Sequence, residues 1–250
     1  MLDIKNISKK IGKTLILNDI NFTVSAGHCY GLLGRNGAGK STLLSILVGN
    51  LKQSSGDVYC LAQLMKNDTV FKEREKIGFF IDESHLIQEF TGWEYLNFIA
   101  NIYNVPSNEI RNRIETLFEF LFDNKSDINQ KISAYSRGMK VKLGICASLV
   151  HKPEILILDE PFAGLDPYSA DKLVQLLNIY RTKSTIILSS HDLEYVEKIC
   201  NLIGVLDKGK LIFNGTLQDF TLNGSKYISE SLINLIKVND YNLNELNWLL

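Results

Sequence analysis

One glycine-rich segment with a lysine and hydroxyl residues has the composition of a phosphate-binding loop. It reads Gly34-Arg35-Asn36-Gly37-Ala38-Gly39-Lys40-Ser41, which fits the pattern GxxxxGK[ST], and Thr42 follows it. Glycines let successive backbone N–H groups point at one anion, and a following helix adds the positive end of its dipole. Lys40 is therefore predicted to reach the β- and γ-phosphates of a nucleotide, and the Ser41 hydroxyl to bind Mg²⁺. The alternative is a glycine-rich turn with an exposed lysine.

A pair of acidic residues follows an apolar segment further along the chain. Ile155-Leu156-Ile157-Leu158 runs directly into Asp159-Glu160. The carboxyl ends of parallel strands border the ligand crevice, so both acids are predicted to face the same crevice as the glycine-rich loop. Asp159 is placed to hold Mg²⁺, directly or through water, and Glu160 to polarise an attacking water. Taken alone, the segment is equally compatible with a strand that ends in a solvated acidic turn.

Short β-rich segments alternate with segments of helical periodicity around these residues. The predicted strands are residues 2–7, 20–24, 29–33, 57–61, 77–81, 155–158, 185–188 and 202–206. The predicted helices are residues 41–48, 93–103, 108–122, 140–150, 170–179 and 193–200. Several strands are continuous apolar runs, which is typical of a parallel sheet covered on both faces. The alternation predicts an α/β fold, with a strand entering the glycine-rich loop and a helix leaving it.

The middle and the end of the chain depart from this alternation. From about residue 84 to residue 150 the predicted helices follow one another, which indicates a helical subdomain inserted into a split α/β core. Its aromatic residues are interpreted as core packing rather than as a binding platform; they are Trp93, Tyr95, Phe98 and Tyr103. The tail, residues 221–250, is rich in asparagine and ends in Trp248-Leu249-Leu250. A short docking helix and a frayed end are both compatible with that tail.

Composition excludes several classes of protein. The chain has 250 residues, of which 45% are hydrophobic and 22% charged, so it is typical of a globular protein and not of a disordered or fibrous one. Its apolar runs fall far short of the roughly 20 residues needed to cross a bilayer, and residues 1–5 lack a secretory signal. The formal net charge of −1 gives no electrostatic reason to expect nucleic acid. Its four cysteines are widely spaced, which favours buried thiols over zinc or disulfides.

With these motifs in place, residues 2–220 resemble the ATP-binding cassette (ABC) family of ATPases. Tyr135-Ser136-Arg137-Gly138-Met139 is similar to the family signature LSGGQ, Ala163-Gly164-Leu165-Asp166 to the D-loop, and Ser189-Ser190-His191-Asp192 to the switch that places a histidine near the γ-phosphate. The resemblance implies a P-loop NTPase (RecA-like) core with a mainly parallel sheet, an N-terminal antiparallel β-subdomain and the inserted helical subdomain. It also implies one ABC ATPase domain over residues 1–220.

The resemblance further implies a site shared between two cassettes. In the family, the P-loop of one subunit holds ATP while the signature of the other covers the γ-phosphate. Ser136, Arg137, Gly138 and Met139 would then act on the ATP of a second cassette, with Asp166 in the D-loop. Glu160 and His191 would act in catalysis. A homodimer and a heterodimer both fit the sequence.

Two positions depart from the family pattern. Asp82 stands where the family usually has the Q-loop glutamine. It would offer a charged oxygen to Mg²⁺ and the attacking water, unless Asp82 or Glu83 only caps the loop. Ile11 stands where an aromatic residue usually stacks on adenine, so it would bind the base by apolar contact alone and weaken purine selectivity.

The resemblance implies a function as the ATP-binding subunit of a membrane transporter, with ATP and Mg²⁺ as cofactors. Separate integral membrane subunits would form the channel, and the cassette would lie on the cytoplasmic side of the membrane. Asp82 and the signature variant look like cassettes that export, or give immunity to, lantibiotics, bacitracin and related antimicrobial peptides. The alternatives are a soluble ABC ATPase acting on ribosomes or DNA, and a P-loop kinase or other nucleotide-binding protein.

Overall fold

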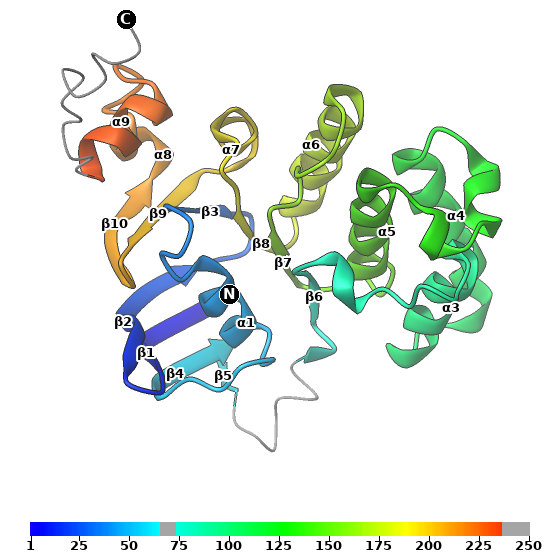
Figure 1. Ribbon diagram of the computed structural model, residues 1–250, viewed down its shortest axis with the longest axis horizontal. Coiled ribbons are helices and arrows are strands. Elements are labelled where there is room, and N and C mark those ends of the chain that lie inside the picture. Colours follow the sequence, from blue (N-terminus) through cyan, green and yellow to red (C-terminus); the bar gives the residue numbers. More distant parts are fainter. Residues whose placement is uncertain (66–73, 237–250) are drawn as a thin grey trace, which may run out of the picture.

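A small antiparallel sheet opens the fold in the computed structural model, which describes residues 1–65 and 74–236. Its strand order is β2-β1-β4-β5 (Figure 1). The strands are β1 (Leu2–Ile11), β2 (Thr14–Val24), β4 (Ser55–Cys60) and β5 (Gln63–Leu64). The predicted strand 20–24 is thus the second half of a long strand that pairs with β1 from Val24 back to Thr14. This sheet is the antiparallel β-subdomain that the family resemblance implies.

The larger sheet has six strands in the order β10-β9-β3-β8-β7-β6. They are β3 (Cys29–Leu33), β6 (Ile77–Phe80), β7 (Ile155–Asp159), β8 (Thr185–Ser189), β9 (Leu202–Asp207) and β10 (Lys210–Thr216). All neighbouring pairs are parallel except β9 and β10, which form a hairpin. The predicted α/β class with a mainly parallel sheet is confirmed.

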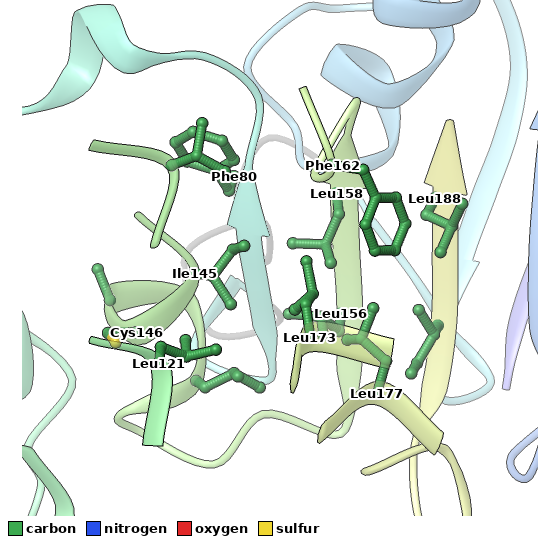
Figure 2. Close-up of a cluster of buried hydrophobic side chains, with 14 of the residues drawn as sticks. Phe80, Leu121, Ile145, Cys146, Leu156, Leu158, Phe162, Leu173, Leu177 and Leu188 are labelled. Carbon is green, nitrogen blue, oxygen red and sulfur yellow. The ribbon is translucent and has the colours of Figure 1, made fainter. Parts of the chain in front are cut away.

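Both faces of this sheet are covered, as the apolar strands predict. Along β7, Ile155 and Ile157 join the core shared with the antiparallel sheet and α1 (Lys40–Leu47). Leu156 and Leu158 join the core on the opposite face. Figure 2 shows that second core, where side chains of β7 and β8 gather with those of α5 (Arg137–Leu149) and α6 (Pro167–Arg181). Burial on two faces explains why β7 has no polar residue before Asp159.

In the described residues between β6 and β7 the chain forms helices joined by loops, and no strand (Figure 1). These are η1 (Glu83–His85), α3 (Gly92–Ile102), α4 (Ser107–Leu121), η2 (Lys125–Asn129), η3 (Ile132–Ala134) and α5. Thr91 caps α3 in a capping box with Glu94, and Ser136 caps α5. Phe90 and Trp93 pack against the main core and Tyr95 is buried in it, as the packing interpretation predicts, whereas Phe98 is 42% exposed.

The C-terminal part adds short helices to the edge formed by β9 and β10. After α6 and α7 (Leu193–Ile199), the chain forms α8 (Leu217–Phe220) and α9 (Ile228–Leu235). Ile228 and Ile236 are buried in the main core, so the described part of the tail is packed. Trp248 and the rest of residues 237–250 lie outside the described residues.

The four cysteines are free and buried. Cys29 and Cys200 bring their Sγ atoms to 3.6 Å in the core between β3 and α7. Burial raises the pKa of Cys146 to about 12, so that thiol stays protonated and unreactive at neutral pH.

Candidate functional site

The glycine-rich segment is the loop that joins the end of β3 to the start of α1. Gly34 has a φ of +148°, and a Cβ atom there would overlap the carbonyl oxygen of Leu206. Gly39, which caps α1, has a φ of +109°. Only glycine adopts these conformations readily. The glycines of the motif therefore set the path of the loop into the helix.

Lys40 is a buried cation at the first position of α1. The residue is only 8% exposed. Its Nζ donates hydrogen bonds to the carbonyl oxygens of Gly34 (2.8 Å) and Arg35 (3.4 Å). Both of these partners are neutral. Because a buried charge is costly unless it is compensated, the ammonium group favours an anion in the space beside it.

That space is a cavity of about 380 Å³ over the loop, which we call the P-loop cavity. The residues predicted to bind phosphate or Mg²⁺ that line it are Asn36, Gly37, Gly39, Lys40, Ser41, Thr42 and Asp159. Glu160 lines it as well, together with Ile16 and Arg35, which the sequence analysis did not single out. Gly34 and Ala38 belong to the loop but do not line the cavity. The structure thus brings the glycine-rich loop and the carboxylate pair together.

Asp159 is the last residue of β7 and lies opposite Ser189 of β8 in the parallel register. It is 7% exposed, and its carboxylate accepts a hydrogen bond from the Ser189 hydroxyl. Ser189 also binds the backbone N–H of Glu160, through its carbonyl oxygen (3.2 Å) and its hydroxyl (3.0 Å). Ser189 therefore fixes both acidic residues, a role that becomes visible only once the two strands are aligned.

Glu160 is held in an uncommon conformation and is paired with His191. Its φ of +49° lies in the left-handed region, which costs roughly 1–2 kcal/mol for a residue with a side chain. Its Oε2 accepts hydrogen bonds from His191 Nδ1 (2.7 Å) and from the His191 backbone N–H (3.2 Å). Such strain, held in place by surrounding contacts, is typical of functional sites. His191 thus reaches the P-loop cavity through Glu160.

The signature residues lie away from the P-loop cavity of the same chain. Ser136 caps α5 by accepting from the Met139 N–H (3.2 Å), and none of the four predicted signature residues lines the cavity. Gly138 faces the D-loop, where a Cβ atom would come within 2.6 Å of the Gly164 carbonyl oxygen. The N-terminus of α5 could thus bind a phosphate, as the N-terminus of α1 can, but it lies on a separate part of the molecule.

Asp166 of the D-loop is the N-cap of α6. Its Oδ1 accepts from the N–H groups of Tyr168 and Ser169, both at 3.0 Å, and its Oδ2 from the Ser169 hydroxyl at 2.6 Å. The hydrogen bonds from Ser169 lower the pKa of the Asp166 carboxyl below its usual value. In this chain Asp166 fixes the start of α6.

Asp82 lines a second cavity of about 650 Å³, which we call the Q-loop groove. Asp82 caps η1, because its Oδ1 accepts a hydrogen bond from the Ser84 N–H (2.6 Å). Its Oδ2 lies 3.9 Å from His85 Nε2. The hydrogen bonds from Ser84 lower the pKa of this carboxyl, so it is charged at neutral pH. The structure therefore shows the capping role and does not bring Asp82 to the P-loop cavity.

Ile11 is at the end of β1, where it pairs with Thr14, and it is 55% exposed. It does not line the P-loop cavity, whereas Ile16 on the adjacent strand does. The hairpin between β1 and β2 thus brings one aliphatic side chain, that of Ile16, to the loop, and Ile11 remains on the exposed end of the hairpin.

Comparison with known proteins identifies the family. The ABC transporter family model matches residues 17–163, more than half of the chain, and that segment contains the glycine-rich loop, the signature and the carboxylate pair. The chain belongs to the ABC transporter family. The predicted family is confirmed, and this ABC protein is accordingly an ATPase of the transporter class, which favours the transporter over a soluble ABC ATPase or a kinase.

Several relatives of this ABC ATPase have names that concern antimicrobial compounds. The linearmycin resistance ATP-binding protein of Bacillus subtilis (strain 168) is 37% identical over 88% of this chain and 70% of the relative. The bacitracin transport ATP-binding protein of Enterococcus faecalis is 33% identical over 91% of this chain and 73% of the relative. The lantibiotic transport ATP-binding protein SrtF of Streptococcus pyogenes is 33% identical over 85% of this chain and 89% of the relative.

Solved structures of ABC cassettes share the fold. A structure described as the ATP binding subunit of an ABC transporter is 28% identical, has a TM-score of 0.87, and is matched over 95% of this chain and 100% of that one. A dimeric ATP-binding cassette in a post-hydrolysis state, bound to ADP and Pi, is 26% identical with a TM-score of 0.78 and is matched over 87% of this chain and 99% of that one. The predicted P-loop NTPase fold is therefore confirmed.

Proposed function

We propose that this ABC ATPase binds Mg·ATP in the P-loop cavity and hydrolyses it as a dimer to drive export through separate membrane subunits. The observation that carries the proposal is the meeting of a buried lysine and an acidic pair in one cavity. Lys40 begins α1, after the loop that follows β3, whereas Glu160 directly follows β7, and both residues line that cavity. Hydrolysis of a phosphoanhydride requires a positive charge that stabilises the phosphates and a base that accepts a proton from the attacking water.

The residues divide the chemistry among them. The loop N–H groups and Lys40 hold the β- and γ-phosphates. The phosphates then replace the loop carbonyl oxygens as the hydrogen-bond acceptors of Lys40. Glu160 orients a water on the γ-phosphate and accepts its proton as the bond to ADP breaks. His191 holds the Glu160 carboxylate through Nδ1 and so fixes the direction from which the proton is accepted. On this geometry we assign a catalytic role to Glu160 and a positioning role to His191.

The donor set of the P-loop cavity fits Mg²⁺. This ion prefers oxygen ligands and usually takes one or two from the protein and the rest from phosphates and water. Ser41 and Asp159 both line the cavity, and Asp159 is buried with its carboxylate oriented by Ser189. These two residues would hold Mg²⁺, which would neutralise phosphate charge when bound. A role for Asp82 in Mg²⁺ binding stays a prediction.

The dimer follows from the separation of the signature and the P-loop. Ser136, Arg137, Gly138 and Met139 do not line the cavity of their own chain, so a second cassette must provide a signature if ATP is to be covered on both sides. Dimeric cassettes among the structural relatives support this arrangement. The partner cassette is either a second copy of this chain or a different one.

ATPase activity is expected to rise more steeply than linearly with protein concentration, because hydrolysis needs two cassettes to meet. Phosphate release measured at saturating Mg·ATP, from nanomolar to micromolar protein, tests this expectation. Activity per molecule should increase until the dimer is saturated. Strictly proportional activity down to nanomolar protein would contradict the shared site.

We place the contact with the membrane subunits at the Q-loop groove. It is lined by Asp82, the Q-loop position, and by residues of β6, η1, α3 and α5, and Tyr95 and Tyr103 are among them. His151 stacks on Tyr103 with ring centroids 3.8 Å apart, and burial lowers its pKa to about 4, so its ring is neutral at physiological pH. The groove thus offers aromatic and polar surface to an inserted segment. Phe90 and Trp93, which pack on the core, do not line it.

Location and domain division are part of the same proposal. Within residues 1–65 and 74–236, no helix combines the length and the apolar character needed to cross a membrane. Attachment to the cytoplasmic face through membrane subunits would place the cassette where ATP is available. The cassette would comprise residues 1–220, with the helices of about residues 84–150 as an inserted subdomain.

Antimicrobial peptides are the cargo class that we propose. The support is that two relatives are named for the transport of bacitracin and of lantibiotics, while a third is named for resistance to another antimicrobial compound, linearmycin. Another relative, from Rhizobium leguminosarum bv. viciae, is named a Nod factor export ATP-binding protein, which supports export as the shared direction. Deleting the gene and measuring the minimal inhibitory concentrations of such peptides tests the cargo class.

Weak discrimination between ATP and GTP is expected from Ile11, because an aliphatic side chain cannot hydrogen-bond the base edges that distinguish adenine from guanine. Stacking of a base on an aromatic ring is worth about 1–3 kcal/mol, and an aliphatic side chain lacks that contribution. Ile11→Tyr should therefore tighten binding of a fluorescent ATP analogue by about tenfold. The parent chain should hydrolyse ATP and GTP at similar rates. A preference for ATP of about a hundredfold, close to 2.7 kcal/mol, would contradict this expectation.

A further inference from the structure

Arg137 of the signature connects three segments that are far apart in the sequence. Its Nε donates to Oε1 of Glu83 in η1 at 3.1 Å, across 54 positions of the chain. Its aliphatic stem lies against Gly164 of the D-loop, where a Cβ atom would come within 3.3 Å of the Arg137 Cγ and Cδ atoms. The side chain of Arg137 is 70% exposed and that of Glu83 is 32% exposed. This ion pair therefore joins the Q-loop to the signature at the surface.

The D-loop side of this contact leads directly to the catalytic acid. The turn after β7 is closed by a hydrogen bond from the Ala163 N–H to the Glu160 carbonyl oxygen (3.1 Å), and Gly164 follows Ala163. Gly138 packs against the Gly164 carbonyl oxygen from the signature side. A shift of the first turn of α5 would therefore displace the segment that follows Glu160.

The Q-loop side of the contact leads to the Q-loop groove. η1 is a single turn of three residues, Glu83–His85, capped by Asp82. Asp82 and His85 line the groove, while Glu83 between them does not and instead binds Arg137. η1 thus contacts the Q-loop groove through His85 and the signature through Glu83.

We propose that Glu83 is a positioning residue for ATP hydrolysis: through Arg137 it fixes the start of α5, and hence Ser136, relative to the Q-loop groove and the D-loop. This inference rests on the proposed function, since it concerns how the signature is presented to the ATP of a second cassette. An arginine at the first position of α5 is opposed by the helix dipole, and α5 has no acidic residue in its first turn. Glu83 supplies the missing negative charge from outside the helix.

The expected effect is on turnover and not on stability. Exposed ion pairs have small energies, so losing this one should lower kcat by about twofold to fivefold. ATP binding to the P-loop of the same chain should not change, because neither Glu83 nor Arg137 lines the P-loop cavity. The melting temperature should also stay at the parent value.

The test is a double-mutant cycle on the purified full-length chain with Mg·ATP. Glu83→Gln, Arg137→Gln and the double variant are compared with the parent for kcat, KM, affinity for a fluorescent ATP analogue and melting temperature. Glu83→Gln should lower kcat in the parent and have no effect in the Arg137→Gln background. Arg111→Gln is the matched control, because Arg111 and Glu115 form a similarly exposed pair at 3.1 Å on α4.

Each result bears on one of the two proposals. A parent that does not hydrolyse ATP at any concentration would contradict the proposed function. If the parent hydrolyses ATP, a Glu83→Gln variant with unchanged kcat overturns the inference, as does an equal loss in the two backgrounds or a loss matched by Arg111→Gln. A loss of kcat that disappears in the Arg137→Gln background, with KM and melting temperature unchanged, supports it.

Discussion

Replacing Glu160 by glutamine is expected to lower steady-state ATP hydrolysis by about 10²–10⁴-fold, the usual contribution of a positioned base. Glutamine has the same shape, and its amide oxygen can still accept from the His191 backbone N–H, which lies 3.2 Å from the carboxylate. The phosphate-binding loop and Lys40 are unchanged. The loss should therefore fall on chemistry while ATP binding is retained.

Retained binding without hydrolysis should trap the ATP-bound dimer. Phosphate release gives the rate, a fluorescent ATP analogue gives the affinity, and size-exclusion chromatography with light scattering gives the mass with and without ATP. Glu154→Gln is a matched control, since Glu154 is exposed just before the opposite end of β7. A Glu160→Gln variant that turned over ATP like the parent would remove Glu160 from the mechanism.

The parts of the site that sequence predicts well are those defined by neighbouring residues. The loop from Gly34 to Ser41 needs glycines at positive φ, a lysine and a hydroxyl at fixed spacing, and each of these is visible in the letters. The acidic pair can also be predicted from neighbouring residues, because a buried apolar strand must end where the first charged residues appear. Membership of the family adds the signature and D-loop, whose roles in hydrolysis stay proposals.

Contacts that depend on strand register could not be predicted in this way. Ser189 binds Asp159 because β7 and β8 are parallel neighbours with those two residues opposite each other. Ile16 reaches the P-loop cavity because β1 and β2 continue to a tight turn at Gly12. Register shifts in β1 break the alternation of apolar and polar residues, which hid the outer half of that hairpin.

One missed element did leave a signal. β10 follows β9 through Lys208 and Gly209, which both have positive φ values, 46° and 76°. A lysine–glycine pair between two apolar segments is a hairpin signal of a weaker kind than asparagine–glycine. By contrast, nothing in the letters distinguishes Asp82 as a cap from Asp82 as a ligand. That distinction depends on where η1 lies relative to the P-loop cavity.

Replacing Lys40 by alanine should weaken ATP binding by about 10–150-fold, which corresponds to a charge-assisted contact of about 1.5–3 kcal/mol. The ammonium group is buried and its partners, the carbonyl oxygens of Gly34 and Arg35, are neutral. A phosphate is a stronger partner than either carbonyl, so the lysine contributes much more to the bound state than to the free one. Hydrolysis should fall at least as far as binding.

The fold should tolerate this change, which makes the binding result interpretable. Alanine removes a buried charge whose hydrogen bonds are to the loop itself, so the melting temperature without nucleotide should stay close to that of the parent. Lys183→Ala is the matched control, because Lys183 is exposed before β8, at the end of the sheet opposite Ser189. Isothermal titration with ATP and with ADP measures the loss. Equal affinity in the parent and in Lys40→Ala would mean that the P-loop cavity is not where the phosphates bind, and the roles of Ser41, Asp159 and Glu160 would have to be reassigned with it.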